Sequence, residues 1–403
     1  MSASRIMTTK PRILRLIHDS GPLSRAELSR ALSLSSSIVS EVTRDLLSLG
    51  ILKETVTSSK PLGRPAVLLD IVPDYGYVIG ATLTGSPPGL VLVDLAGKPA
   101  AAVYEVDIAS TDPRNVVSSL VNQVKELVEK ACIPDKRLLA IGIGVSGIVD
   151  RNTGVCKRST VLGWDEVPLR DMLQENLQLP VFVDNDANTL AMAENLFGEL
   201  VGYSDAAVVT VGRGIGAGFL HHHDLYTGRF GGAGEIGHCT VDRDGPVCRC
   251  GKKGCLEAVA SVPAMMAQAQ ENLRPAPRSF AELVSQALQG DAAALAILER
   301  AGDAIGLAVS YIVNLLNPQA VLVTSCDVDL SFLEPAILES LERNAFRYLL
   351  EHTRVKVKCL HRQSWALGAA SIAVNELLQN PSLLERRREV NRYSLGSQRQ
   401  KIV

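Results

Sequence analysis

Four residues between positions 238 and 255 have the side chains and the spacing of a zinc site: His238, Cys248, Cys250 and Cys255, in an H-x9-C-x-C-x4-C pattern. Three thiolates and one imidazole can close a tetrahedral site with no position left for water, which is the structural and not the catalytic kind of zinc centre. Glycines lie between the cysteines, where a chain that folds around one ion needs tight turns. The alternative is three unrelated thiols and a core histidine, which the close spacing disfavours. We therefore expect a structural Zn²⁺ that fixes a loop.

Further polar side chains precede and flank this stretch. Glu235 and Glu257 stand at the two ends of the segment that the zinc would fix. Asn185 and Asp186 end a predicted strand and open a predicted helix. A carboxylate can accept hydrogen bonds from vicinal sugar hydroxyls, and a carboxamide can both accept and donate. Asp186 also suits a plain helix N-cap, and the two roles are compatible.

Two further patterns are less specific. A glycine-rich loop over residues 212–218 follows a predicted strand and can cradle phosphate with backbone N–H groups, but a lone pattern of this kind says little. His221, His222 and His223 come directly after it. We interpret these three histidines as the end of a hairpin and not as a second metal site.

Composition restricts the class of protein. The net charge of −2 and a pI of about 6.4 exclude a chain that binds nucleic acid by its total charge, so a local region must carry any such function. No apolar run is long enough to span a bilayer, and the N-terminus lacks the apolar core of a signal peptide, so we expect no membrane partner. Eight cysteines in 403 residues are not a disulfide framework, which indicates the reducing cytoplasm.

The first 75 residues follow the order helix, helix, turn, helix and hairpin, which predicts a winged helix-turn-helix DNA-binding domain. An S-x-x-E capping box at Ser24 opens the second helix, and the third is predicted from about Ser36 to Leu49, ended by Gly50. Small hydroxyl residues at its start allow close approach to a DNA groove. The expected DNA-binding residues are Ser36, Ser37, Ser40, Thr43, Arg44, Lys60 and Arg64. The alternative is a three-helix protein-interaction module with a solvated polar face.

Strands alternate with helices after Pro73, which implies an α/β fold whose sheet begins with an antiparallel part. Ligands of such sheets usually bind at the carboxyl ends of the strands. We expect a first α/β lobe over residues 76–184, completed by about 365–385, and a second over 185–364 that contains the zinc loop. Residues 386–403 are expected to be a disordered tail.

These motifs resemble those of the ROK family (repressors, open reading frames, kinases), in its branch of xylose and N-acetylglucosamine repressors. The resemblance rests on C-x-C-G-x-x-G-C-x-E at 248–257, E-x-G-H at 235–238 and D-N-D-A-N at 184–188. It implies an actin-like, two-lobed sugar-kinase fold, which is ribonuclease H-like, with an N-terminal winged helix. It also implies that the four residues of the zinc pattern bind the metal. The implied sugar-binding residues are Asn185, Asp186, Glu235, His238 and Glu257. His238 would hold the metal with one ring nitrogen, its other side lying near a sugar hydroxyl.

The chain departs from the family's kinases at the phosphate motifs. The slots of their first motif, D-x-G-G-T-K, hold Thr82, Thr84, Gly85, Ser86 and Pro87 here. Arg213 stands where their second phosphate loop has a threonine. Because phosphoryl transfer depends on positioning and charge neutralisation, we expect a retained sugar pocket and a lost nucleotide site.

We therefore predict a sugar-responsive transcriptional repressor that is not an enzyme. It would bind operator DNA as a homodimer or homotetramer in the cytoplasm, with a small-molecule sugar as effector. One alternative is an ATP-dependent sugar kinase with Asp186 as general base. Another is a docking platform for a transport protein, which sugar does not touch.

Overall fold

The computed structural model describes residues 2–56, 67–83, 89–104, 110–134 and 137–385. The chain forms two compact units. The first comprises residues 1–186, 196–202 and 366–403, and the second comprises residues 187–195 and 203–365. In the described part of the chain, no helix combines the length and the apolar character needed to cross a bilayer.

The N-terminal part of the first unit is a winged helix. It comprises α1 (Ser2–Ser20), β1 (Leu23–Ser24), α2 (Arg25–Ala31), α3 (Ser36–Leu49), β2 (Leu52–Val56) and β3 (Val67–Ile71), with sheet order β1-β3-β2. The predicted capping box at Ser24 is present, and Gly50 ends α3 in a left-handed conformation (φ 77°). The apolar faces of the helices close a small core that contains Leu14, Leu28 and Leu46, each fully buried. The predicted wing residues Lys60 and Arg64 lie outside the described residues.

The rest of the first unit is built on a five-stranded sheet of order β11-β7-β4-β5-β6. Its strands are β4 (Tyr77–Thr82), β5 (Gly89–Asp94), β6 (Pro99–Tyr104), β7 (Leu138–Val145) and β11 (Val181–Asn185). The helices are η1 (Pro73–Tyr75), α4 (Pro113–Lys130), α5 (Leu169–Leu177), α13 (Ser364–Gln379) and α14 (Pro381–Glu385). A smaller sheet contains β8 (Ile148–Asp150), β9 (Val155–Ser159) and β10 (Trp164–Val167).

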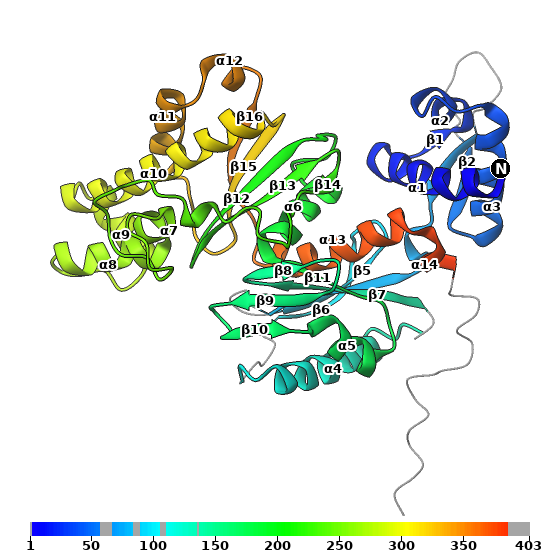
Figure 1. Cartoon of the computed structure of the whole chain (residues 1–403), viewed down its shortest axis with the longest axis horizontal. Helices are drawn as coiled ribbons and strands as arrows, with labels where there is room; N and C mark the ends of the chain where they lie inside the picture. Colours follow the sequence, from blue (N-terminus) through cyan, green and yellow to red (C-terminus); the bar gives the residue numbers. More distant parts are fainter. Residues whose placement is uncertain (1, 57–66, 84–88, 105–109, 135–136, 386–403) are drawn as a thin grey trace, which may run out of the picture. The chain divides into compact units, whose positions relative to one another are not determined.

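Side-chain alternation explains how helices cover both faces of this sheet (Figure 1). Ile79 and Ile141 face the core that α4 and α5 close. Their neighbours Gly80 and Gly142 face α13, whose backbone approaches so closely that a Cβ on Gly142 would lie 1.7 Å from the carbonyl oxygen of Ala369. The two glycines therefore allow α13 to pack directly on the two central strands.

The second unit repeats this design. Its sheet has the order β14-β13-β12-β15-β16, formed by β12 (Ala206–Val211), β13 (Ile215–His221), β14 (Asp224–Leu225), β15 (Ala320–Ser325) and β16 (Arg354–Cys359). In both sheets the first three strands are antiparallel, and the last two run parallel to the first. The shared order 3-2-1-4-5 agrees with the predicted two-lobed fold, and the antiparallel beginning was also predicted.

Helices of the second unit carry its core and its site. They are α6 (Asp186–Phe197, most of which belongs here), η3 (Ile236–His238), α7 (Leu256–Ala260), α8 (Val262–Asn272), α9 (Phe280–Leu288), α10 (Ala292–Leu316), α11 (Glu334–Asn344) and α12 (Arg347–Leu350). The apolar α10 lies against the sheet and the other helices, with Ile305 and Val309 fully buried (Figure 1). The zinc pattern occupies the segment between η3 and α7.

Candidate functional site

The four residues of the zinc pattern come together in the second unit. One ligand atom from each of His238, Cys248, Cys250 and Cys255 lies within 4.8 Å of the other three. Cys248 Sγ is 3.6 Å from His238 Nδ1, and Cys250 Sγ is 3.6 Å from Cys255 Sγ. A tetrahedral zinc ion with ordinary bond lengths would separate two sulfurs by roughly 3.8 Å and a sulfur from a nitrogen by roughly 3.6 Å. The cluster therefore fits a metal ion of this kind.

The local backbone explains why the cluster forms. Gly251 and Gly254 have left-handed conformations (φ 89° and 65°), and a Cβ on Gly254 would lie 1.4 Å from the carbonyl oxygen of Asp242. Only glycine allows the chain to fold back so tightly at this point. Isolated bridges between Thr240 and Cys255 and between Val247 and Lys253 hold the segment against itself.

His238 is turned so that its two ring nitrogens face different groups. Nδ1 faces Cys248, and Nε2 lies 3.8 Å from Glu235 Oε2. A metal on Nδ1 would fix the ring and direct Nε2 toward Glu235. Partial burial raises the pKa of Glu235 above its ordinary value. The nearby Glu257 carboxylate adds to this increase, while His238 and Arg249 oppose it. The arrangement brings together three of the predicted sugar-binding residues: Glu235, His238 and Glu257.

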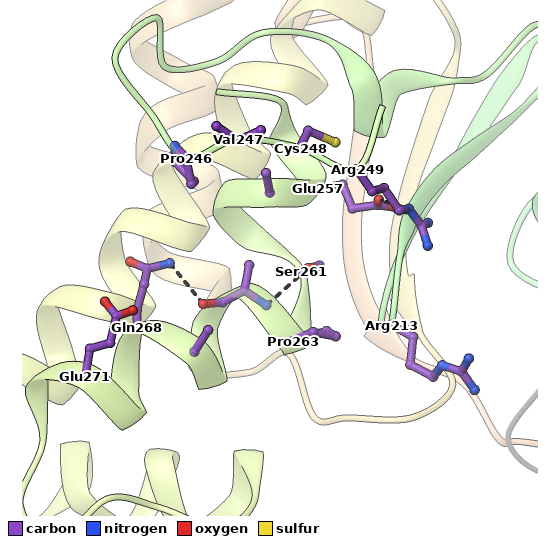
Figure 2. A pocket seen from close by; sticks show the side chains of 13 residues that line it. Arg213, Pro246, Val247, Cys248, Arg249, Glu257, Ser261, Pro263, Gln268 and Glu271 are labelled. Carbon is purple, nitrogen blue, oxygen red and sulfur yellow. Dashed lines mark hydrogen bonds and ion pairs between the residues drawn. The ribbon is translucent and has the colours of Figure 1, made fainter. Parts of the chain in front are cut away.

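Glu257 is the most constrained of these residues. Its side chain is 11% exposed and forms a two-point ion pair with Arg249, with Nε–Oε1 at 2.9 Å and Nη2–Oε2 at 3.0 Å (Figure 2). Oε2 also accepts from the backbone N–H of Ile215 at 3.3 Å. A Cβ on Gly214 would lie 2.8 Å from this same oxygen, so the glycine leaves room for the carboxylate. Both carboxylate oxygens thus have donors from within the unit.

A cavity of about 470 Å³ lies beside the zinc loop in the second unit. Pro246, Arg249 and Glu257 line it on the loop side, and Gln268 and Glu271 of α8 line the other side (Figure 2). Arg213, from the loop that follows β12, also lines it. The lining of the cavity is largely apolar, with charged side chains of both signs.

Asn185 and Asp186 belong to the first unit. Asn185 ends β11 and donates from Nδ2 to the carbonyl oxygen of Gly147 at 2.9 Å, while its backbone N–H donates to Asp184 Oδ1 at 2.7 Å. Asp186 is the first residue of α6. This is the predicted strand-to-helix position at the carboxyl end of a parallel strand. Arg151 Nε lies 3.9 Å from Asp184 Oδ2, so its positive charge stabilises the buried carboxylate.

The predicted DNA-binding residues of α3 divide into two groups. Ser36, Ser37 and Arg44 are exposed, and Ser40 is half-buried. The prediction that Thr43 points outward is wrong, because its side chain is fully buried and its Oγ1 accepts from Arg25 Nε at 3.1 Å. Arg25 reaches it from the start of α2, so Thr43 ties the two helices of the motif together.

Comparison with known proteins shows the family to which this chain belongs. The sequence profile described as "ROK family" matches residues 89–376, which is most of the chain. The chain belongs to the ROK family. It is similar to the xylose repressor of Caldicellulosiruptor bescii, with 30% identity over 386 residues that cover 92% of this chain and 96% of that protein. The expected resemblance is confirmed.

Solved structures of ROK proteins extend this result to the fold. A ROK family transcriptional regulator, described as a homologue of the Escherichia coli Mlc protein, matches with a TM-score of 0.82 and 26% identity, covering 95% of this chain and 99% of that one. A ROK glucokinase from Streptomyces griseus, in complex with glucose and AMPPNP, matches with a TM-score of 0.62 and 27% identity, covering 74% and 99%. The predicted sugar-kinase fold with an N-terminal winged helix is therefore confirmed.

The sequence did not indicate two contacts in the second unit. Arg249 lies inside the C-x-C-G motif, so its position next to a metal ligand was the available signal, but its pairing with Glu257 depends on the folded loop. Asp205 lies beside His221 across the β12–β13 hairpin, with Oδ1 and Nδ1 2.6 Å apart. Only the strand register brings these two residues together.

Proposed function

We propose that this ROK protein is a sugar-responsive transcriptional repressor that binds operator DNA through its winged helix. One observation carries the proposal: a single chain joins a winged helix with an exposed α3 start to a sugar-kinase fold with a candidate metal cluster. Ser36, Ser37 and Arg44 are available to DNA phosphates and base edges. Residues 1–75 contain ten Lys and Arg against seven Asp and Glu, a modest net positive charge. Two copies in a homodimer or homotetramer would therefore supply the affinity, at half-sites about one helical turn apart or a multiple of it.

On the ligand side, we propose that Zn²⁺ bound by the four clustered residues is structural and holds Glu235, His238 and Glu257 for sugar hydroxyls. Zinc on Nδ1 of His238 would leave Nε2 to the ligand side. Glu257 offers a nearly buried carboxylate whose present donor is Arg249, and a sugar with vicinal hydroxyls would compete with that guanidinium. We propose Asn185 and Asp186, in the first unit, as further sugar-binding residues.

A route from the sugar to the DNA-binding head lies within the first unit. Asp184, next to Asn185, faces Arg151, and Arg151 Nη2 forms an ion pair with Glu376 Oε1 of α13 at 2.7 Å. The adjacent Asn375 is fully buried, and its Oδ1 accepts from Arg15 Nη1 of α1 at 2.9 Å. We propose that this chain of polar contacts couples the end of β11 to the winged helix.

Two more contacts join the winged helix to the rest of the first unit. Lys10 Nζ of α1 lies 2.6 Å from both Asp45 of α3 and Glu385 of α14, so one ammonium group joins the proposed recognition helix to the lobe. His18 packs edge-on against Phe197, the last residue of α6, with ring centroids 5.6 Å apart. Because α6 begins at Asp186, a shift of this helix on sugar binding would reach α1 directly.

We also propose that the chain has no sugar kinase activity. Thr82, buried at the end of β4, takes the place of the acid that begins the kinases' first phosphate motif. The remaining slots of that motif, from Thr84 onward, lie outside the described residues. Arg213 replaces the threonine of the second phosphate loop. The kinase alternative, with Asp186 as general base, requires these losses to be compensated elsewhere. None of the eight cysteines, all of which the structure describes, forms a disulfide bond, which suits the proposed cytoplasmic location.

The experiment is a thermal-shift screen of the purified chain with D-xylose, D-glucose, N-acetylglucosamine and their phosphates, each with and without ATP. A ligand at about 100 times its Kd stabilises the folded state by roughly 2.7 kcal/mol, which is readily detected. We expect one sugar class to raise the melting temperature without ATP and to change affinity for operator DNA. ADP release with turnover would support the kinase, and the absence of any sugar effect would support the docking platform.

A further inference from the structure

A cluster of two histidines and one aspartate lies at the end of the second sheet, separate from the cysteine cluster. Asp205, His221 and His222 each offer a ligand atom, and the three atoms lie within 4.8 Å of one another. His221 ends β13, whose other end, at Ile215, contacts Glu257. Seven residues of extended strand span roughly 20 Å, so the two clusters are distinct.

The hairpin turn brings the two imidazoles together. Neighbouring residues of a strand point to opposite faces, so consecutive histidines would normally diverge. Here His221 pairs with Asp224, which leaves His222 and His223 as a two-residue turn, both with positive φ (52° and 63°). Such turns strongly favour Asn-Gly, and left-handed histidines cost free energy. The result is that the rings of His221 and His222 lie with centroids 4.1 Å apart.

The carboxylate is held in place by its surroundings. Gln319 Oε1 accepts from the backbone N–H of Asp205 at 3.1 Å, and Gln319 N donates to the carbonyl oxygen of Asp205 at 2.8 Å. The turn is tied to the same loop, since His223 N donates to the carbonyl oxygen of Ser204 at 2.8 Å. Ser204 Oγ donates to Asp205 Oδ2, which leaves Oδ1 facing Nδ1 of His221 at 2.6 Å.

We propose that Asp205, His221 and His222 form a second metal site, which binds an exchangeable divalent transition ion such as Zn²⁺, Co²⁺ or Ni²⁺. Two imidazoles and one carboxylate suit these ions better than Mg²⁺ or Ca²⁺, which require oxygen ligands. An ion bound between Asp205 Oδ1 and His221 Nδ1 would replace the hydrogen bond that now joins them. Bonds of 2.0–2.2 Å to each ligand would place the three atoms roughly 3 Å apart, which exposed side chains reach by small rotations. Water completes the coordination because both histidines are exposed.

This inference does not rest on the proposed function, and metal titration tests it. The full chain, with one equivalent of Zn²⁺ in its cysteine cluster, is titrated with Co²⁺ by calorimetry and absorption spectroscopy. We expect one further equivalent to bind, with the spectrum of cobalt bound to nitrogen and oxygen and no sulfur charge transfer. His222→Ala and Asp205→Asn should each abolish it. Ser204→Ala should weaken it about tenfold, the usual effect of losing a group that orients a ligand.

The matched control is His352→Ala, which removes another exposed histidine, outside the cluster, and should bind cobalt as the wild type does. Since the altered side chains are exposed or half-buried, the variants should keep the melting temperature of the wild type. The proposal is overturned if the wild type binds no second equivalent. It is also overturned if the cluster variants bind as tightly as His352→Ala, because the uptake would then be non-specific.

Discussion

Replacing Arg15 with alanine should loosen the DNA-binding head from the lobe without unfolding either. The contacts of the Arg15 side chain include an ion pair with Asp19 inside α1 (2.7 Å) and a hydrogen bond to the fully buried Asn375 of α13 (2.9 Å). The first contact exists whether or not the head is docked, so its loss affects both states alike. The second exists only in the docked state.

The expected magnitude follows from this distinction. A hydrogen bond to a charged donor contributes about 1.5–3 kcal/mol, and Asn375 Oδ1 would remain buried without this donor. We take about 2 kcal/mol, which increases the undocked population roughly thirtyfold at 1.4 kcal/mol per factor of ten. Sugar affinity should not change, since Arg15 lies in the head, but the effect of sugar on operator affinity should shrink.

Hydrogen exchange of the α1 and α13 amides measures the docking, and operator titrations with and without sugar measure the coupling. The control is Arg12→Ala, one turn earlier in α1, because Arg12 donates only within the head, to the carbonyl oxygen of Leu32 at 3.1 Å. If Arg15→Ala and Arg12→Ala show the same exchange and the same sugar response, the proposed route through α13 is refuted.

Four further variants test the zinc ligands, the sugar site and the recognition helix. Cys255→Ser should abolish stoichiometric zinc, measured by elemental analysis, and lower the melting temperature; a folded variant that still binds one zinc would contradict the assigned ligands. Arg249→Ala should tighten sugar binding a few-fold, since a half-exposed ion pair contributes up to about 1 kcal/mol and the sugar would no longer compete with it; weaker binding in calorimetry would instead make Arg249 a sugar contact. Arg44→Ala should weaken operator binding in anisotropy titrations and leave stability unchanged, whereas Thr43→Ala should lower stability by about 1 kcal/mol; the reverse pattern would show that α3 is oriented differently.

Local patterns predicted the local features well. The third helix was predicted from about Ser36 to Leu49, which are its observed bounds, because its cap, its apolar period and the terminal Gly50 agree. The clustering of the four residues in the zinc pattern was also predictable, since all four lie in one short segment that can close only a small loop. The strand-to-helix position of Asn185 and Asp186 followed from an apolar run that stops at a polar pair.

Tertiary contacts explain what the sequence did not predict. Thr43 sits on the polar side of the helical pattern, but Arg25 from another helix covers it. The two sheets share a strand order because their strands pair in the same way, and the amino-acid sequence shows no corresponding repeat. The contact of Arg15 with Asn375 joins positions 360 residues apart, and no local signal marks such a pair.

The central claim is that a sugar, held by residues beside a metal cluster, controls operator binding. The most direct test measures operator affinity of the zinc-loaded chain by fluorescence anisotropy, with and without the sugar that gives the largest thermal shift, for the wild type and for Glu257→Ala. The account predicts a five- to hundredfold change in the wild type, typical of a coupling of about 1–3 kcal/mol, and little change in the variant. Equal operator affinity with and without that sugar in the wild type would contradict it.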